Sequence, residues 1–519
     1  MKKRHMKKRA KLIFIRAVTL AVSFLIQAAI LIIPWIFLKQ KWNNAFVVIN
    51  VLFNIISVLV VIYIVRNDTN PEYKIPWIIF ILIFPFFGGI AYLMYGKWRF
   101  SRNERKRYKN TAFKAHNANH LMPVYTDDGT VPSGIMRQFD YLNKNADAHA
   151  FTDTKVTYYD LGDNVWPVML EELKKAEKYI FMEYYIIAPG DMLESILTVL
   201  EEKAAAGVDV RFMYDSFGSI MKAPYKINDR LKAAGIKVFE FNSFRHILDS
   251  RYNNRDHRKM CIIDGITGFT GGVNLADEYI NHQEMYGHWK DASVMLKGRG
   301  VWSMVTLFLA LWDDASNSED DFNDFIPDYS GLEPCDEASL VAPYTDYPFD
   351  HEQVGRTVYC NILAHATHYV YIMTPYLIVD NVMLNALESA AKSGVDVRLI
   401  TPGIPDKKLV FWLTQSYYAS LLQAGVRIYQ YDPGFIHSKV FLSDDAISVV
   451  GTINLDYRSL THHFENAVLM YNTKANAWIY KDFIDTFEKC SEITPEFVKN
   501  TKWYKKAAMP VLRLLSPLM

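Results

Sequence analysis

The residues best suited to chemistry lie in a motif that the sequence contains twice. Each copy has a histidine, a lysine two residues later, an aspartate five residues after the lysine, and an asparagine further on. These residues are His257, Lys259, Asp264 and Asn274 in the first copy, and His437, Lys439, Asp444 and Asn454 in the second. Side chains two residues apart in an extended chain point to the same face. The histidine and lysine of each copy are therefore predicted to face the same spot.

An imidazole beside an ammonium group suits a phosphodiester substrate. Lysines can offset the charge that grows on phosphate oxygens in the transition state, and asparagines can add neutral donors. One histidine can attack phosphorus and form a phosphohistidine, while the other protonates the leaving alkoxide and then deprotonates the incoming alcohol. Imidazole fits both roles because its ordinary pKa is about 6.5. A lysine among the candidate ligands argues against a metal, and we predict neither a metal nor a cofactor.

The two histidines are expected to have different roles. Two arginines, Arg255 and Arg258, lie beside His257 and favour the neutral imidazole that a nucleophile requires. An apolar approach precedes His437, and pairing with a carboxylate such as Glu465 would raise its pKa and keep a proton ready for the leaving oxygen. We therefore predict His257 as the nucleophile and His437 as the general acid–base.

Four carboxylates are candidates for the site. Asp291 and Glu465 each follow the asparagine of their half, and we predict that they orient the histidines. Asp264 and Asp444 belong to the motif itself, but a structural role in a turn explains them better than direct participation.

Aromatic residues, nearby histidines and cysteines are weaker candidates. Tyr185 and Tyr376 can line a substrate groove, although core aromatic residues are the more common explanation. His462 and His463 are predicted to lie in a loop near the mouth of the site rather than to bind a metal. The four cysteines are scattered without a CxxC pair, which argues against a disulfide framework or a zinc knuckle.

The same order of predicted strands and helices precedes both motifs. GVDVRFMYD in the first half corresponds to GVDVRLITP in the second, and LKAAGIKVFEFN corresponds to LLQAGVRIYQYD. Apolar strands alternate with helices that end at a glycine, which is typical of an α/β fold. Strands are expected at residues 179–187, 208–214, 236–241 and 370–378, and helices at 165–176, 192–206, 226–234 and 383–392. We predict one α/β unit used twice.

The apolar runs and composition shifts divide the chain into six predicted parts. They are a membrane region at 1–109 with apolar runs at 17–38, 46–65 and 76–95, a connector at 110–151, a first catalytic half at 152–315, a linker at 316–348, a second catalytic half at 349–498, and a C-terminal interfacial or docked segment at 499–519. Each apolar run is close to the roughly 20 residues that cross a bilayer, so transmembrane helices are expected.

The basic flanks of the apolar runs leave the membrane topology open. Basic residues cluster at residues 2–11 and 97–107, and such clusters tend to stay in the cytoplasm. Three full crossings cannot place both clusters there, so either one run does not cross or one cluster lies outside. Pro85, Gly88 and Gly89 suit a kinked or re-entrant third run.

The paired motifs resemble those of the phospholipase D superfamily, and finer features resemble the bacterial cardiolipin synthases. The finer features are TPYLIVD, GGVNLADEY, GHWKDASV, GTINLDYRSL, the apolar PWIIFILIFPFFGGIAYLMYG and the C-terminal RLLSPLM. One departure is an extra apolar run, because many members of that group have two membrane spans. The resemblance implies two α/β sandwiches packed around a pseudo-twofold axis, with both motifs in one site.

The resemblance also implies an activity. A phosphatidyl group would pass from one phosphatidylglycerol to another, giving cardiolipin and glycerol at a multi-pass protein of the cell membrane. The expected partners are phosphatidylglycerol, other anionic phospholipids and the bilayer, with the catalytic halves facing the cytoplasm. A hydrolytic phospholipase D, a membrane-tethered nuclease and a non-enzymatic scaffold remain alternatives. With 57 basic and 56 acidic residues, the chain lacks the basic surplus typical of nucleic-acid binders, and no nucleic acid is expected.

Overall fold

The computed structural model divides the chain into two compact units. The described residues are 18–28, 43–67, 70–96, 102–122, 125–127, 129–220, 222–242, 254–332, 339–348 and 352–518. One unit comprises Met1–Phe100, Phe244–Asn254 and Pro510–Met519, and the other comprises Ser101–Ser243 and Arg255–Met509. The predicted basic cluster at residues 2–11 lies outside the described residues.

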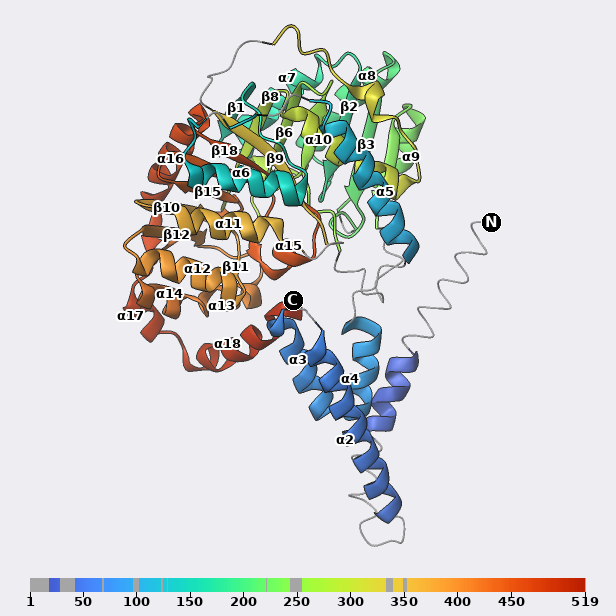
Figure 1. The fold of residues 1–519 in the computed structure, drawn as a ribbon, viewed down its shortest axis with the longest axis vertical. Helices are drawn as coiled ribbons and strands as arrows, with labels where there is room; N and C mark the ends of the chain where they lie inside the picture. Colours follow the sequence, from blue (N-terminus) through green and yellow to red (C-terminus); the bar gives the residue numbers. More distant parts are fainter. Residues whose placement is uncertain are drawn as a thin grey trace. The chain divides into compact units, whose positions relative to one another are not determined.

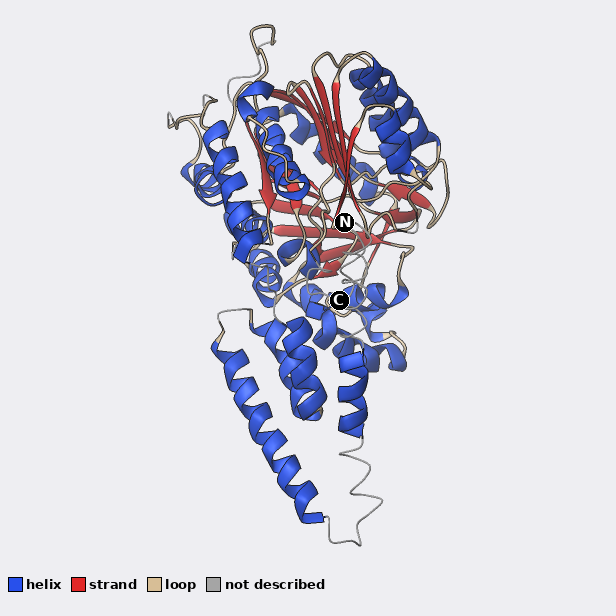
Figure 2. Ribbon diagram, turned by 90° about the vertical axis from the view of Figure 1, so that its right-hand side faces the viewer, coloured by secondary structure: helices blue, strands red, loops and turns tan. Residues whose placement is uncertain are grey.

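The unit that contains the N-terminal region is helical wherever its secondary structure is described (Figure 2). Its elements are a helix at residues 18–28, α2 (Asn43–Arg66), α3 (Pro71–Ile83), α4 (Pro85–Ala91), the π-helical turn η1 (Tyr92–Gly96) and the 3-10 turn η6 (Ser516–Leu518). Ile64, Ile81 and Tyr92 form its small buried cluster.

The predicted kink in the third apolar run is confirmed. Helix α3 ends at Ile83, and α4 begins at Pro85, whose ring is tolerated in the first turn of a helix but would break a helix interior. A Cβ on Gly88 would lie 2.8 Å from the Cα of Ile81, so only glycine permits this close approach of the two segments.

The prediction of transmembrane helices is not confirmed. Among the residues that the structure describes, no helix has the length and apolar character needed to cross a membrane.

The second unit begins with two helices in place of the irregular connector that the sequence predicted. These are α5 (Arg102–Asn119) and α6 (Ser133–Ala146). Met136, Phe139 and Leu142 lie on one face of α6 at helical spacing and are buried, which explains why a largely polar segment forms a helix. The prediction was wrong because polar residues dominate both segments and conceal this short apolar stripe.

The first half of the second unit is built on a seven-stranded mixed sheet with the order β1-β8-β6-β5-β2-β3-β4. Its strands are β1 (Thr154–Tyr159), β2 (Tyr179–Tyr184), β3 (Asp209–Asp215), β4 (Lys237–Phe241), β5 (Met260–Ile263), β6 (Thr267–Gly271) and β8 (Ser293–Gly298). Its helices are α7 (Gly162–Leu173), α8 (Asp191–Ala205), α9 (Ile227–Ala233), the 3-10 turn η4 (Asp277–Ile280) and α10 (Val301–Ser316).

The second half contains an eight-stranded sheet with the order β19-β13-β12-β10-β15-β16-β18-β9. Its strands are β9 (Leu340–Asp346), β10 (Tyr369–Met373), β12 (Asp396–Pro402), β13 (Arg427–Tyr431), β15 (Val440–Ser443), β16 (Ile447–Gly451), β18 (Glu465–Tyr471) and β19 (Cys490–Glu492). Its helices are α11 (Val354–His365), α12 (Asn381–Lys392), α13 (Lys408–Gln415), α14 (Tyr418–Ala424), α15 (Tyr457–Thr461), α16 (Lys474–Phe487) and α17 (Pro495–Lys499). Helix α18 (Trp503–Leu515) follows.

The two sheets confirm the predicted duplication. Read from β9, the second sheet has the order β9-β18-β16-β15-β10-β12-β13, which matches the first sheet strand for strand before β19 is added at its edge. In both halves the strand that follows the motif histidine, β5 or β15, pairs antiparallel with the aromatic strand, β2 or β10. The elements of both halves can be followed in Figure 1.

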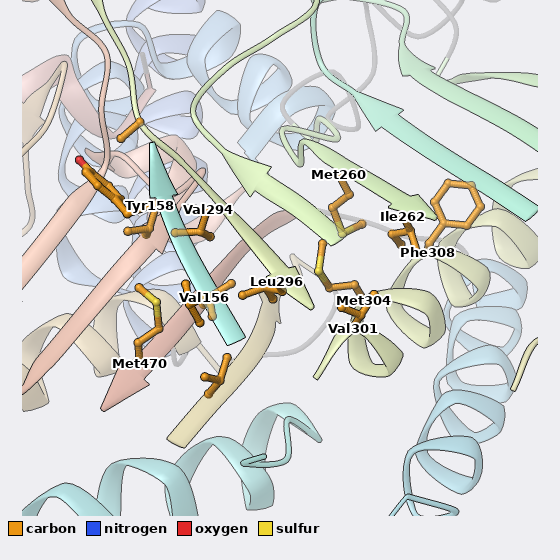
Figure 3. Packing of buried hydrophobic residues seen from close by; sticks show 14 of the residues in the cluster. Val156, Tyr158, Met260, Ile262, Val294, Leu296, Val301, Met304, Phe308 and Met470 are labelled. Carbon is orange, nitrogen blue, oxygen red and sulfur yellow. The ribbon is translucent and has the colours of Figure 1, made fainter. Parts of the chain in front are cut away.

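A shared apolar core holds the two sheets together. Figure 3 shows side chains of β1, β5, β8, α10 and β18 packed in this cluster. The labelled residues are Val156, Tyr158, Met260, Ile262, Val294, Leu296, Val301, Met304, Phe308 and Met470. A second cluster lies under α7, α8 and α9 on the other face of the first sheet. Because both faces of β2 are covered, its sequence is an almost continuous apolar run.

The predicted linker is shorter than expected. Residues 301–316 form α10 and residues 340–346 form β9, an edge strand of the second sheet. The 3-10 turn η5 (Phe322–Phe325) lies between them, with Phe322 buried. The aspartates and prolines around these elements concealed both the turn and the following strand.

Candidate active site

Each motif reaches the site beside a strand of the opposite half. The short strand β14 (Gly434–Ile436), which precedes His437, pairs in parallel with β7 (His288–Lys290) of the first half. In the equivalent position, Asp256 forms a parallel bridge with Phe464 of the second half. This exchange brings the two motifs together, as the resemblance implied.

The exchange also pairs each histidine with a carboxylate from the other half. The Nδ1 atom of His257 lies 2.9 Å from both carboxylate oxygens of Glu465. The Nδ1 atom of His437 lies 2.6 Å from Oδ2 of Asp291. The predicted pairing of His437 with Glu465 is therefore wrong, because the strands cross between halves. A carboxylate that accepts Nδ1–H leaves the lone pair on Nε2.

Both motif lysines are buried beside their histidines. The Nζ of Lys259 donates to the backbone oxygen of His257 at 2.6 Å. The Nζ of Lys439 contacts the backbone oxygen of His437 and lies 2.9 Å from its Nδ1. Burial lowers the pKa of Lys259 to about 8, although Glu465 and Asp291 oppose the shift. Burial likewise lowers the pKa of Lys439 to about 7.

Burial also keeps both histidines neutral. It lowers the pKa of His257 well below its ordinary value, and the charge of Lys259 adds to the effect. It lowers the pKa of His437 to about 4, with Lys439 adding to the shift and Asp291 opposing it. The prediction that neighbouring arginines keep His257 neutral is wrong. Arg258 instead pairs with the buried Glu183, with Nη2 and Oε1 2.5 Å apart.

The two asparagines have different hydrogen-bond partners, with Asn274 bonded to backbone and Asn454 to a side-chain carboxylate. Oδ1 of Asn274 accepts a hydrogen bond from the backbone N–H of Ile186 at 2.9 Å, and its Nδ2 donates to the hydroxyl of Tyr279 at 2.8 Å. Nδ2 of Asn454 donates to Asp456 at 3.0 Å. Both side chains are buried, and each amide NH₂ donates at least one hydrogen bond to another side chain of the protein.

The motif aspartates lie at turns and do not contact the histidines in the described hydrogen bonds. Asp264 accepts hydrogen bonds from the backbone N–H groups of residues 177–179 at 2.7–2.8 Å. Asp444 accepts equivalent bonds from residues 367–369 at 2.7–2.9 Å. Both adopt left-handed backbone conformations, with φ of 52° and 53°. These bonds tie the β5–β6 and β15–β16 turns to the strands beside them.

His462 and His463 lie in the turn between α15 and β18, as predicted, but both are buried and His463 lies beside His257. Its ring centroid lies 5.4 Å from that of His257, and its Nδ1 lies 3.4 Å from Glu465. Donor atoms of His257, His463 and Glu465 all lie within 4.8 Å of one another, which is close enough to hold a metal ion. The Nζ of Lys259 donates to the backbone oxygen of His257, and its positive charge would oppose a cation there.

Sequence reasoning missed two polar residues that support the first histidine. The hydroxyl of Thr452 donates to Glu465. The Nδ2 of Asn466 donates to Thr270 at 2.7 Å, and its Oδ1 lies 3.4 Å from the backbone nitrogen of Lys259. Thr452 directly follows Gly451, and Asn466 directly follows Glu465. An alignment of the two halves would have drawn attention to both positions.

More tyrosine, tryptophan and phenylalanine rings have described contacts with the second histidine than with the first. The ring centroids of Tyr279, Trp289 and Phe435 lie 5.5, 5.6 and 5.8 Å from that of His437. Tyr185 lies 4.9 Å from His257, whereas the hydroxyl of Tyr376 donates to Asp406 at 2.7 Å. Of the two tyrosines predicted for a groove, only Tyr185 has a described ring contact with a motif histidine.

The fold and the site define a duplicated phospholipase D-like enzyme. Two neutral imidazoles, each held by a carboxylate, lie with two ammonium groups in one buried site. This set can attack a phosphodiester, neutralise its oxygens and move a proton.

Comparisons with known proteins name the family. A model described as "Cardiolipin synthase, PLD-like domain" matches residues 169–297 and 359–487, and a model described as "Phospholipase_D-nuclease N-terminal" matches residues 55–97. The chain belongs to the cardiolipin synthase family of phospholipase D-like proteins, which are phosphatidyltransferase enzymes.

Individual relatives extend the similarity over most of the chain. An uncharacterized protein of Streptococcus mutans is 41% identical, over 88% of this chain and 99% of its own. A cardiolipin synthase of Clostridium perfringens is 33% identical, over 87% of this chain and 95% of its own. Cardiolipin synthase 2 of Bacillus anthracis is 32% identical, over 90% of this chain and 91% of its own.

A solved structure supports the fold. The phosphatidylserine synthase of Haemophilus influenzae is 14% identical and has a TM-score of 0.55, covering 75% of this chain and 100% of the other. At this identity the likeness concerns the fold alone.

Proposed function

We propose that this chain is a cardiolipin synthase that joins two phosphatidylglycerols and releases glycerol. The observation that carries the proposal is the crossed pair of carboxylate-held histidines, each with its own lysine, in a single buried site. Relatives named cardiolipin synthase support the choice of lipid.

The first step forms a covalent intermediate. The Nε2 of His257 attacks phosphorus of the donor lipid, a phosphorus–nitrogen bond forms, and the bond to the glycerol oxygen breaks. The bound phosphate anion favours the imidazolium form of His437. His437 gives the proton on its Nε2 to that oxygen, becomes neutral, and glycerol leaves. Lys259 and Lys439 stabilise the charge on the phosphate oxygens, and the anionic substrate in turn restores their protonated forms.

The second step reverses the roles. Neutral His437 takes the proton from a hydroxyl of the second phosphatidylglycerol, whose oxygen attacks the phosphohistidine. The phosphorus–nitrogen bond breaks, cardiolipin is released, and His257 is free again. One phosphodiester replaces another, so no nucleotide is consumed.

Supporting residues are proposed to act on the histidines from a distance. Glu465 and Asp291 hold the Nδ1 tautomers, and burial raises the pKa of Glu465 well above its ordinary value while Lys259 offsets part of the shift. Asn274 keeps the backbone at Ile186 in place, and both Asn274 and Asn454 retain capacity to donate to the phosphate. Asp264 and Asp444 are proposed to anchor turns rather than to take part in chemistry.

The enzyme is proposed to work at the membrane with its catalytic halves on the cytoplasmic side. Helix α2 exposes apolar side chains such as Val51, Leu52 and Ile55, which need an apolar environment. Basic residues between 97 and 109 would meet anionic headgroups, and each basic side chain near the surface contributes about 1 kcal/mol of binding free energy.

A cysteine introduced at Tyr225 tests this placement. Tyr225 is 89% exposed, and the thiol should resist an impermeant reagent in intact cells. Ready labelling would reject the cytoplasmic placement.

Purified full-length protein with phosphatidylglycerol as sole lipid tests the function. Cardiolipin and free glycerol in equal amounts, resolved by lipid mass spectrometry, are expected. Phosphatidic acid with little cardiolipin would identify a hydrolytic phospholipase D instead, and cleavage of oligonucleotides without lipid turnover would identify a nuclease.

A further inference from the structure

Three histidines and an aspartate cluster at the end of α5, away from the catalytic motifs in the sequence. Nδ1 of His116 lies 2.7 Å from Oδ1 of Asp147. The ring centroids of His116 and His120 are 4.3 Å apart, and those of His120 and His149 are 4.9 Å apart. One donor atom from each of His116, His120 and Asp147 lies within 4.8 Å of the others. The function proposed above uses none of these four side chains.

His149 supplies an independent sign of a missing ligand. Its side chain is almost fully buried, with 2% relative exposure, and it makes an edge contact with His120. Neither of its ring nitrogens has a hydrogen-bond partner among the described residues. Buried polar groups are nearly always paired, so an imidazole in this position calls for a partner.

The local structure explains why the four side chains converge. His116 and His120 are four residues apart at the end of α5, so they project from one side of the helix. Asp147 caps α6 in a left-handed conformation with φ of 53°, and His149 lies two residues further along the chain. Nδ2 of Asn119 donates to the backbone oxygen of Asp147 at 3.1 Å and fixes the two segments together.

We propose that His116, His120, Asp147 and His149 form a binding site for a divalent transition metal of the zinc class. Three imidazoles and one carboxylate match the nitrogen and oxygen ligands that Zn²⁺ takes in tetrahedral sites. Calcium and magnesium prefer sites built from oxygen alone. His116 and His120 are exposed, which gives an ion a path to the buried His149.

Metal binding requires the contact between His116 and Asp147 to open slightly. Nδ1 of His116 lies 2.7 Å from Oδ1 of Asp147, and a metal would take the place of the hydrogen bond between them. Metal–ligand bonds of about 2.0–2.2 Å place neighbouring donor atoms roughly 3.3 Å apart, so these two atoms separate by about half an ångström.

The site would fasten α5 to the chain that leads into β1. Ala118 accepts a hydrogen bond from the indole N–H of Trp302 at 3.0 Å, and Asn119 accepts one from Thr306 at 2.8 Å. Both donors belong to α10, which packs on the catalytic sheet. An ion that binds the folded state therefore stabilises this corner of the enzyme without touching the catalytic residues.

The test compares metal binding by the chelator-stripped full chain and two variants. The double variant His116→Ala and His120→Ala removes two exposed ligands, and His282→Ala is the matched control. His282 forms an exposed pair with Asp191 at 3.1 Å and, among the described residues, belongs to no group of three potential metal ligands. Zn²⁺ stoichiometry by titration, the visible spectrum of added Co²⁺ and the melting temperature are measured for each protein.

The wild type and the His282→Ala control are expected to bind one more equivalent of Zn²⁺ than the double variant. Their Co²⁺ forms should show the intense visible bands of tetrahedral nitrogen and oxygen coordination, and Zn²⁺ should raise their melting temperatures. Loss of two ligands should weaken binding at this site by at least about 100-fold, since loss of a supporting contact alone costs 10- to 100-fold. His149→Gln should weaken binding while His116 and His120 remain.

Equal stoichiometry, affinity and thermal response in the double variant and the wild type would overturn the proposal. Any zinc held by the catalytic cluster of His257, His463 and Glu465 would persist in both proteins and cancel in the comparison. Phosphatidylglycerol turnover by the stripped double variant should equal that of the stripped wild type. The metal proposal and the proposed function are thus tested by separate readouts.

Discussion

The two histidine–carboxylate pairs share a motif and a place in the duplicated fold but have different surroundings. At the first pair, Thr452 donates to Glu465 and His463 lies beside it. At the second pair, Gly272 takes the place of the threonine, because a Cβ there would lie 1.9 Å from Oδ1 of Asp291. In the second pair the shorter carboxylate, Asp291, packs on Gly272. In the first pair the longer carboxylate, Glu465, accepts a hydrogen bond from the Thr452 hydroxyl.

We propose that this difference gives the two motif histidines distinct roles. Lys259 and His463 both lower the pKa of His257, which suits a neutral nucleophile. At His437, Asp291 opposes the lowering of the pKa and so stabilises the protonated form that a general acid passes through. The rings of Tyr279 and Trp289 lie 5.5 and 5.6 Å from that of His437.

The largest expected effect comes from replacing the histidines one at a time with asparagine. His257→Asn should reduce turnover by at least about 1,000-fold and abolish the covalent adduct, because the attacking nitrogen is lost. His437→Asn should also be poor with phosphatidylglycerol, but should still form the adduct with a lipid whose leaving group needs no proton. Mass spectrometry of the trapped protein measures whether each variant carries the covalent phosphatidyl adduct. An adduct in the His257→Asn variant alone would exchange the two roles.

A smaller effect is expected when the carboxylates are neutralised. Glu465→Gln should slow adduct formation even with the activated lipid, because the tautomer of His257 is no longer fixed. Asp291→Asn should slow turnover of phosphatidylglycerol by about 100-fold and have much less effect with the activated lipid. Single-turnover kinetics with both lipids measures the difference. Equal losses for both variants with both lipids would show that the two pairs are not specialised.

The lysines should set the alkaline limb of the pH profile. An ammonium group is present below its pKa, and burial lowers that pKa to about 7 for Lys439 and about 8 for Lys259. The ratio kcat/KM should therefore fall as pH rises through this range, by about tenfold per pH unit for each lysine lost. The profile is measured on the free enzyme at low substrate. A flat profile up to pH 9 would contradict the requirement for both charges.

The smallest effect on activity is expected at the motif aspartates. Asp264→Ala and Asp444→Ala each leave three backbone N–H groups without their acceptor, which should cost about 1–3 kcal/mol of unfolding free energy. Turnover at low temperature should remain within a few fold of the wild type. Denaturant titration and activity assays on the same samples separate the two. Loss of activity in a fully folded variant would show that these aspartates take part in catalysis.

Local patterns in the sequence predicted most of the secondary structure. Apolar strands and glycine-terminated helices gave boundaries within a few residues for β2, β3, α8 and α12, because alternation and helix ends depend on near neighbours. Helices α5 and α6 and the edge strand β9 were not predicted, because polar residues dominate both helices and flank the strand, and only packing reveals their apolar faces.

The sequence by itself determined the chemistry of this protein, and the tertiary structure decided how its parts are paired. Two histidines, two lysines and two carboxylates could be identified from motif and order alone, because their types define what they can do. The pairing of Glu465 with His257 and of Asp291 with His437 follows from strand contacts between the two halves. The paired residues are 208 and 146 positions apart in the sequence. No local pattern encodes such contacts. The burial that lowers the pKa of both motif histidines and both motif lysines likewise arises only when the two sheets close over their shared core.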